Sequence, residues 1–230
     1  MIVDTYTYRN QGCPKPVDSF GGHDQRCPHA FSLGRHDHVQ NTALWRKLKE
    51  AGKDPQLSTV HELRASSTNR SQRKGDITAK DLHEDGLPTI LDVGITYPLV
   101  DTNITNKSTV ERGFAANRYA SRKNDNANAI IDNGNLPYHF SAITSGTFGA
   151  FGNGTWSLIN TACDEATHPN ALDDYDPWSL PGPKRDFVLS LGFALQRANS
   201  NMLRRADERR RQAIASNKYS SRTRARDLGV

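Results

Sequence analysis

The segment from Thr89 to Thr96 is the most strand-like part of this sequence, and a single carboxylate interrupts it. Apolar and β-branched residues stand on both sides of Asp92, so this aspartate takes a position typical of a buried strand. A polar side chain at such a position costs several kcal/mol unless it is paired or bound to a metal. Asp92 therefore needs a partner, or else it faces solvent on an edge strand.

A second carboxylate, Asp76, begins a shorter predicted strand at 76–79, and the two strands flank a turn at Asp85-Gly86. A hairpin can bring Asp76 and Asp92 to one side of a sheet. With the Val93 carbonyl and water, the two carboxylates would form a hard oxygen site that suits Mg²⁺. Such a site could polarise a phosphate and lower the pKa of an attacking water. The alternative is that Asp76 only caps a turn.

Hydrophobic periodicity and turn residues predict the remaining secondary structure. The capping box Ser108-x-x-Glu111 predicts the start of the second helix. This order of helix, three strands with an antiparallel start, helix and strand predicts a compact α/β domain. The expected elements are a helix over 36–51 closed by Gly52, strands over 57–63, 76–79 and 89–96, a helix from Ser108 to about Ile131 with Val110 facing inward, a strand over 138–144, and a glycine-rich loop over 145–154 before a short helix.

Composition divides the chain into four predicted regions. Many Gly, Pro, Asp and His residues over 1–35 predict loops, and 36–163 would form the α/β domain. A Pro- and Asp-rich linker is expected over 164–183, followed by a basic helical extension and tail over 184–230. We expect residues 212–230 not to be ordered.

The charges are segregated along the sequence. Lys and Arg outnumber Asp and Glu by 12 to 7 over residues 1–75 and by 12 to 4 over 184–230, whereas the middle has 6 against 14. Carboxylates collect divalent cations, and flanking Lys and Arg neutralise phosphates, so this pattern suits a metal-dependent nuclease. The alternative is an acidic globular middle with a solvated basic tail.

Membrane insertion, secretion and a disulfide framework are not expected. The longest nearly unbroken apolar run, Phe187 to Leu195, is about half of a membrane span, and the N-terminus has no basic start or apolar stretch. Three cysteines are an odd and sparse set, which favours a reducing compartment. We expect an intracellular protein, located in the nucleus.

Three residues of the N-terminal region, Cys13, His23 and Cys27, could supply three of the four ligands of a structural Zn²⁺ site. Either His29 or His36 would complete the set. The alternative is a degenerate knuckle that binds no metal and whose thiols are buried or free.

Several short motifs together carry a resemblance to a known family. They resemble the C-terminal region of certain non-LTR retrotransposon polyproteins, in which a zinc-knuckle-like segment precedes a restriction-enzyme-like endonuclease of the PD-(D/E)XK superfamily. The resemblance covers residues 10–160. Its motifs are His23-Asp24-Gln25-Arg26-Cys27, Gly34-Arg35-His36-Asp37-His38-Val39, Glu62, Gly75-Asp76 and Leu91-Asp92-Val93-Gly94-Ile95-Thr96.

This resemblance implies a restriction-endonuclease-like fold that nicks DNA by metal-assisted attack of water. Asp76 and Asp92 would bind the metal, and Glu62 would assist through the metal or a water. Gly94 stands where restriction enzymes have a lysine, and the resemblance implies that Lys123, from the following helix, orients the water or stabilises charge on the phosphate. The alternative is a binding module that kept the fold but lost turnover.

Basic residues outside the carboxylate site are candidates for contacts with phosphates of DNA or of retroelement RNA. Such contacts position a nucleic acid and do not read its sequence. The alternative is that they form the solvated face of an amphipathic helix and a solvated helix end. The candidates are Arg35, His36, Arg46, Lys47, Arg73, Lys74, Arg204, Arg205 and Arg209.

Overall fold

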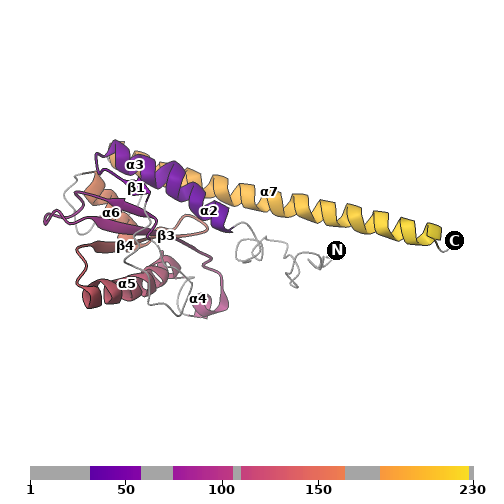
Figure 1. Cartoon of the computed structure of the whole chain (residues 1–230), viewed down its shortest axis with the longest axis horizontal. Coiled ribbons are helices and arrows are strands. Elements are labelled where there is room, and N and C mark those ends of the chain that lie inside the picture. Colours follow the sequence, from indigo (N-terminus) through magenta and orange to yellow (C-terminus); the bar gives the residue numbers. More distant parts are fainter. Residues whose placement is uncertain (1–31, 58–74, 106–109, 164–181, 228–230) are drawn as a thin grey trace. The chain divides into compact units, whose positions relative to one another are not determined.

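The computed structural model describes residues 32–57, 75–105, 110–163 and 182–227. They belong to two compact units: His36–Gln196 carries the sheet, and the other unit includes residues 32–35 and 197–227. The elements, most of them labelled in Figure 1, are α2 (Ser32–His38), the π-helical η1 (Val39–Leu44), α3 (Trp45–Glu50), β1 (Gln56–Leu57), β2 (Ile77–Ala79), β3 (Thr89–Thr96), α4 (Asp101–Thr105), α5 (Phe114–Gly134), β4 (His139–Gly146), α6 (Asn153–Ala162) and α7 (Gly182–Asp227).

The four strands form one mixed sheet in the order β1-β2-β3-β4. The first three strands pair antiparallel, with Ile77 opposite Leu91, whereas β3 and β4 are parallel, with Asp92 opposite Ala142. A parallel pair needs a crossover connection, and α5 supplies it. The predicted α/β class is therefore confirmed.

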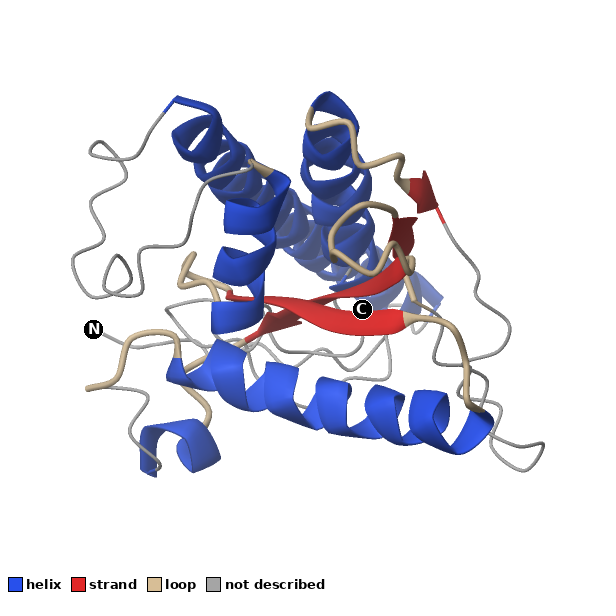
Figure 2. Cartoon of the chain, turned by 90° about the vertical axis from the view of Figure 1, so that its left-hand side faces the viewer, coloured by secondary structure: helices blue, strands red, loops and turns tan. Residues whose placement is uncertain are grey.

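Helices cover both faces of this sheet (Figure 2). On β3, Leu91 and Val93 point to the main core, which η1, α3, α6 and the first turns of α7 complete. Ile90 points to the opposite face, where Ile131 of α5 packs against it. Because side chains alternate along a strand, Asp92 lies on the same face as Ile90, the face that α5 covers.

The strands at 76–79, 89–96 and 138–144 are confirmed as β2, β3 and β4, and α6 follows the glycine-rich loop as predicted. The first helical segment also ends as predicted, with Gly52 at a φ of +73°. It begins earlier than predicted, however, because α2 starts at Ser32, within the region expected to form loops. Of the predicted strand over 57–63, only Leu57 is described, at the end of β1.

The predicted start of the second long helix is wrong. Helix α5 begins at Phe114, and Gly113, with a φ of +74°, turns the chain into it. Val110 is 82% exposed and does not face the core. Ser108 lies outside the described residues. A glycine that adopts a left-handed conformation without strain starts this helix, in place of the capping box. The short α4 was not predicted.

The first part of α7, over 184–196, belongs to the unit that carries the sheet, whereas residues 197–227 belong to the other unit. Phe187, Leu191 and Leu195 of α7 are buried in the same core cluster as Leu44 and Leu91, so the helix begins as part of the compact unit. The apolar stripe that the sequence shows on this helix therefore packs against the sheet domain.

Residues 212–227, which we expected not to be ordered, continue α7. No Gly or Pro interrupts residues 193–228, and ion pairs one turn apart support the exposed helix. These pairs are Arg204 with Glu208 and Arg211 with Asp207. No helix among the described residues is long and apolar enough to cross a membrane.

Candidate metal centre

Three side chains from separate elements meet beside the centre of β3. His36 comes from α2, Asp76 directly precedes β2, and Asp92 lies within β3. Each offers one ligand atom, and these atoms lie within 4.8 Å of one another. Among the residues that the structure describes, no other group of three such side chains converges in this way.

Asp76 is fixed by backbone and side-chain hydrogen bonds. Its N–H donates to the Leu91 carbonyl at 2.8 Å, which extends the pairing of β2 with β3 by one residue. Its Oδ2 accepts the Val93 N–H at 2.6 Å, and its carbonyl accepts Nε2 of Gln40 at 2.9 Å. The hairpin therefore holds the Asp76 carboxylate beside Asp92, as the sequence predicted.

His36 lies between two carboxylates. Its Nε2 is 2.9 Å from Asp76 Oδ2, and its Nδ1 is 3.2 Å from Asp37 Oδ1. Burial lowers the pKa of His36, but the hydrogen bonds and negative charges of Asp76 and Asp37 outweigh this effect and raise the pKa above its ordinary value. We predicted His36 as a phosphate contact or a zinc ligand, and the structure places it against Asp76.

Asp92 pairs with a lysine from the crossover helix. Lys123 of α5 donates from Nζ to Asp92 Oδ1 at 2.7 Å and to the Val93 carbonyl at 3.1 Å. Burial raises the pKa of Asp92 to about 6; the Lys123 charge opposes this shift, and the neighbouring Asp76 adds to it. Two adjacent carboxylates that repel each other, with an imidazole beside them, form a donor set that fits a divalent cation.

The backbone N–H and carbonyl groups of Val93 each have a hydrogen-bond partner. Its N–H binds Asp76 and its carbonyl accepts Lys123. A carbonyl oxygen has two lone pairs, so the metal contact that we expected from Val93 stays a prediction.

Tyr119 explains why the lysine of this site comes from α5. A Cβ at Gly94 would lie 2.5 Å from the Tyr119 ring, so no larger side chain fits at this position of β3. Lys123 lies one turn after Tyr119, and its Nζ is 5.2 Å from the centre of the ring. The aromatic ring fills the space beside Gly94, and the next turn of the same helix delivers an ammonium group to Asp92.

Many predicted site residues lie outside the described part of the chain. They are Glu62, Arg73 and Lys74, together with the zinc candidates Cys13, His23, Cys27 and His29. The side chain of Arg209 is likewise not described. The roles expected of all these residues stay predictions.

Arg35 and Lys47 are engaged by other side chains of the protein. Arg35 is only 6% exposed and donates from Nη1 to Asn199 Oδ1 at 3.4 Å, and burial lowers its pKa to about 10. Its role as a nucleic-acid contact stays a prediction. Lys47 forms ion pairs with Glu50 and Asp186, which neutralise its charge. Arg46, Arg204 and Arg205 are exposed.

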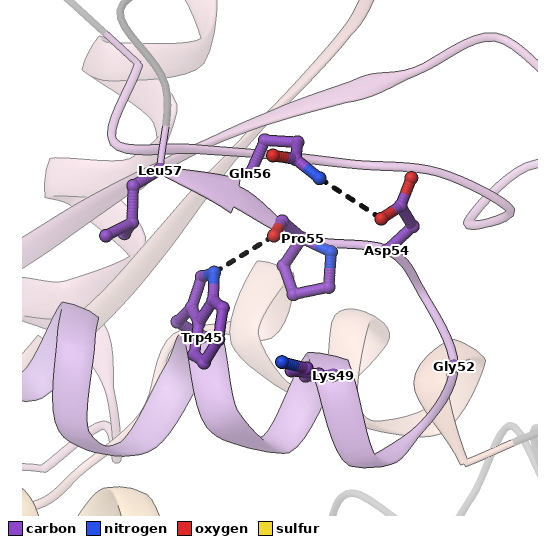
Figure 3. Close-up of a pocket in the computed structure, with 7 residues that line it drawn as sticks. All are labelled: Trp45, Lys49, Gly52, Asp54, Pro55, Gln56 and Leu57. Carbon is purple, nitrogen blue, oxygen red and sulfur yellow. Dashed lines mark hydrogen bonds between the residues drawn. The ribbon is translucent and has the colours of Figure 1, made fainter.

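A cavity of about 560 Å³ lies between α3 and β1 and shares no lining residue with the metal group (Figure 3). The Trp45 indole donates to the Pro55 carbonyl at 2.9 Å, and Gln56 donates to Asp54 at 3.1 Å. The ammonium group of Lys49 lies 4.9 Å from the centre of the Trp45 ring. The hydrogen bond from Trp45 links α3 to the residue directly before β1.

No known family model matches the chain. Over 90 residues, which are 38% of the chain, it is 28% identical to the 1,4-alpha-glucan branching enzyme GlgB of Aliivibrio fischeri. The matched region spans 12% of that enzyme.

Proposed function

We propose that this protein is a metal-dependent DNA endonuclease of the PD-(D/E)XK type, of retroelement origin, that hydrolyses one strand of a duplex at a time. The observation that carries this proposal is the convergence of Asp76 and Asp92 beside β3, with Lys123 on Asp92. The sequence motifs that resemble retroelement endonucleases include both aspartates. The mixed sheet, with α5 crossing between β3 and β4, supports the same assignment.

The roles of the residues follow from their positions. Asp76, Asp92 and His36 would hold a divalent cation, for which the carboxylates favour Mg²⁺. When bound, that cation supplies Lewis acidity and a water of lowered pKa. The Lys123 ammonium is placed to orient the water or to balance negative charge that develops on the phosphate. Glu62 would assist through the metal or an adjacent water.

Basic side chains outside the site would bind the phosphates of DNA, or of retroelement RNA. Arg46, Arg204 and Arg205 are the exposed members of the described set. Binding through such residues releases counterions, so affinity should fall steeply as salt increases. A structural Zn²⁺ in the N-terminal region and a nuclear location belong to the same proposal.

The decisive experiment is nicking of a supercoiled plasmid by the native chain with Mg²⁺. Asp92→Ala and Asp76→Ala should each lower the nicking rate by at least about 100-fold, because each removes a ligand of the ion that activates the water. Lys123→Ala should lower the rate by about 100- to 1,000-fold, because it removes one stabilising donor. Arg122→Ala, the exposed neighbour on α5, is the matched control and should stay within about threefold of native. Equal nicking rates for the native chain and Asp92→Ala would contradict the proposed endonuclease function.

A second candidate is a nucleic-acid-binding remnant of the same fold that has lost turnover. Two sequence features favour it: Gly94 stands where restriction enzymes have a lysine, and Asp125-Asn126 stand near the position at which the family that the chain resembles has a Lys-Tyr pair. This candidate predicts salt-sensitive binding of DNA by the native chain with no nicking. The plasmid assay and a filter-binding titration on the same preparation distinguish the two.

A further inference from the structure

The metal group contains a nitrogen donor that the carboxylate pattern alone does not reveal. Nε2 of His36 and the two carboxylates supply one nitrogen and two oxygens, all within 4.8 Å of one another. Mg²⁺ is a hard cation that prefers an all-oxygen environment and keeps several waters. Divalent transition metals accept imidazole readily, and Mn²⁺ accepts both carboxylate and imidazole ligands.

A carboxylate stands behind the histidine on the side away from the site. Asp37 Oδ1 lies 3.2 Å from Nδ1, while Nε2 faces Asp76 at 2.9 Å. This is the arrangement found behind metal-binding histidines, in which a carboxylate accepts the second ring N–H and orients the imidazole. His36 and Asp37 are adjacent in α2, so the helix positions the ligand and its support together.

The partner carboxylate is held in place by the neighbouring elements. Asp76 Oδ2 accepts the Val93 N–H from β3, and the Asp76 backbone carbonyl accepts Nε2 of Gln40 from η1. The oxygen that faces His36 is thus fixed before any ion binds, and a preformed site loses little entropy on binding.

We propose that the His36–Asp76–Asp92 group binds a first-row divalent transition metal such as Mn²⁺ in preference to Mg²⁺, and that His36 sets this preference. The inference rests on the proposed function in taking these residues as the metal site. It departs from the expectation of Mg²⁺, because the third donor is an imidazole nitrogen and not an oxygen.

The test measures metal binding by the full chain, separately from catalysis. Titration calorimetry at about pH 8 gives the affinities for Mn²⁺ and Mg²⁺, and the native chain should bind Mn²⁺ at least about tenfold more tightly. Pulsed electron paramagnetic resonance of the bound Mn²⁺ should show coupling to a ¹⁴N nucleus from His36. This second measurement needs no variant, so it holds even if a substitution disturbs folding.

Three variants, one of them a control, test whether His36 sets the preference for Mn²⁺ over Mg²⁺. His36→Gln should lose the ¹⁴N coupling and weaken Mn²⁺ binding by about 10- to 100-fold. His36→Glu, which restores a third oxygen donor, should bind both ions and lower the ratio of their affinities by about tenfold. His139→Gln is the matched control, because His139 pairs with Asp85 and is not part of the metal group. Its coupling and affinities should match those of the native chain.

The outcomes separate this inference from the proposed nuclease. Failure to bind Mn²⁺, equal affinities for the two ions, or Mn²⁺ bound without ¹⁴N coupling would each overturn the inference. If the chain nicks plasmid DNA in spite of such results, the proposed endonuclease function is retained. If the chain prefers Mn²⁺ and shows the ¹⁴N coupling but does not nick DNA, the inference is supported and the proposed endonuclease function is contradicted.

Discussion

At the scale of single residues, the site holds two carboxylates that repel each other, and two cationic side chains only partly offset this repulsion. Asp76 and Asp92 face each other beside β3, with Lys123 on one carboxylate and His36 on the other. Burial raises the pKa of Asp92 to about 6 in spite of the Lys123 charge. A folded chain that holds such a pair without metal is less stable than one in which a divalent cation lies between them.

Because of this repulsion, the free energy of unfolding of the metal-free chain should depend on pH. Asp92 has a pKa of about 6 in the folded chain and an ordinary value of 3.8, so between these values the folded state binds more protons than the unfolded state. The contribution of Asp92 to the free energy of unfolding therefore falls as pH rises from about 4 to about 6, by up to about 3 kcal/mol. Urea unfolding in EDTA gives the free energy of unfolding at each pH. The contribution of Asp92 is the value for the native chain minus the value for Asp92→Asn.

The control for this measurement is Asp125→Asn, an exposed change on the same helix as Lys123. Its profile should parallel that of the native chain. A difference profile for Asp92→Asn that is flat, or that rises over this interval, would contradict the position of Asp92 in the structure.

At the scale of elements, the fit between β3 and α5 decides which residue can serve the site. Gly94 has no side chain, and the Tyr119 ring occupies the space beside it. Because α5 crosses over β3 at this point, Lys123 reaches Asp92 from one turn further along the helix. The resemblance implied Lys123, but its contact with Asp92 depends on how the helix lies across the strand.

Gly94→Ala should therefore destabilise the chain by about 1–3 kcal/mol, because the new methyl group meets the ring at 2.5 Å. Gly192→Ala is the matched control: it lies within α7, and a Cβ there meets no atom within 4 Å. That change should stabilise the chain by about 0.5–1 kcal/mol, because alanine favours a helix over glycine. Chemical denaturation compares the two, and a Gly94→Ala chain as stable as native would refute the close contact.

At the scale of the whole molecule, segments from distant parts of the sequence build one core. Leu44 and Leu48 near the beginning pack in the same cluster as Leu91 of β3 and Leu195 of α7. The N-terminal helical segment therefore depends on the C-terminal helix for its burial, and His36 is held beside the sheet by a helix that this core anchors.

Leu195→Ala should lower the free energy of unfolding by about 2–5 kcal/mol, because the side chain is 1% exposed and its removal leaves a cavity. Phe193→Ala on the same helix is the control, since Phe193 is 70% exposed, and it should change stability by less than about 0.5 kcal/mol. Thermal and urea unfolding test the pair. Similar effects of the two changes would show that α7 is not part of the core.

Local patterns in the sequence determined much of this structure. Short apolar and β-branched runs determined β2, β3 and β4, and the stripe from Phe187 to Leu195 determined the buried face of α7, because each pattern lies within one element. The hairpin also determined that Asp76 and Asp92 would meet. The resemblance named Lys123 for this site, but only the tertiary structure decided that it pairs with Asp92 and that His36 pairs with Asp76. His36 lies 40 positions before Asp76, and Lys123 lies 31 positions after Asp92. Such contacts depend on how helices pack across a sheet, which a pattern within one element does not record.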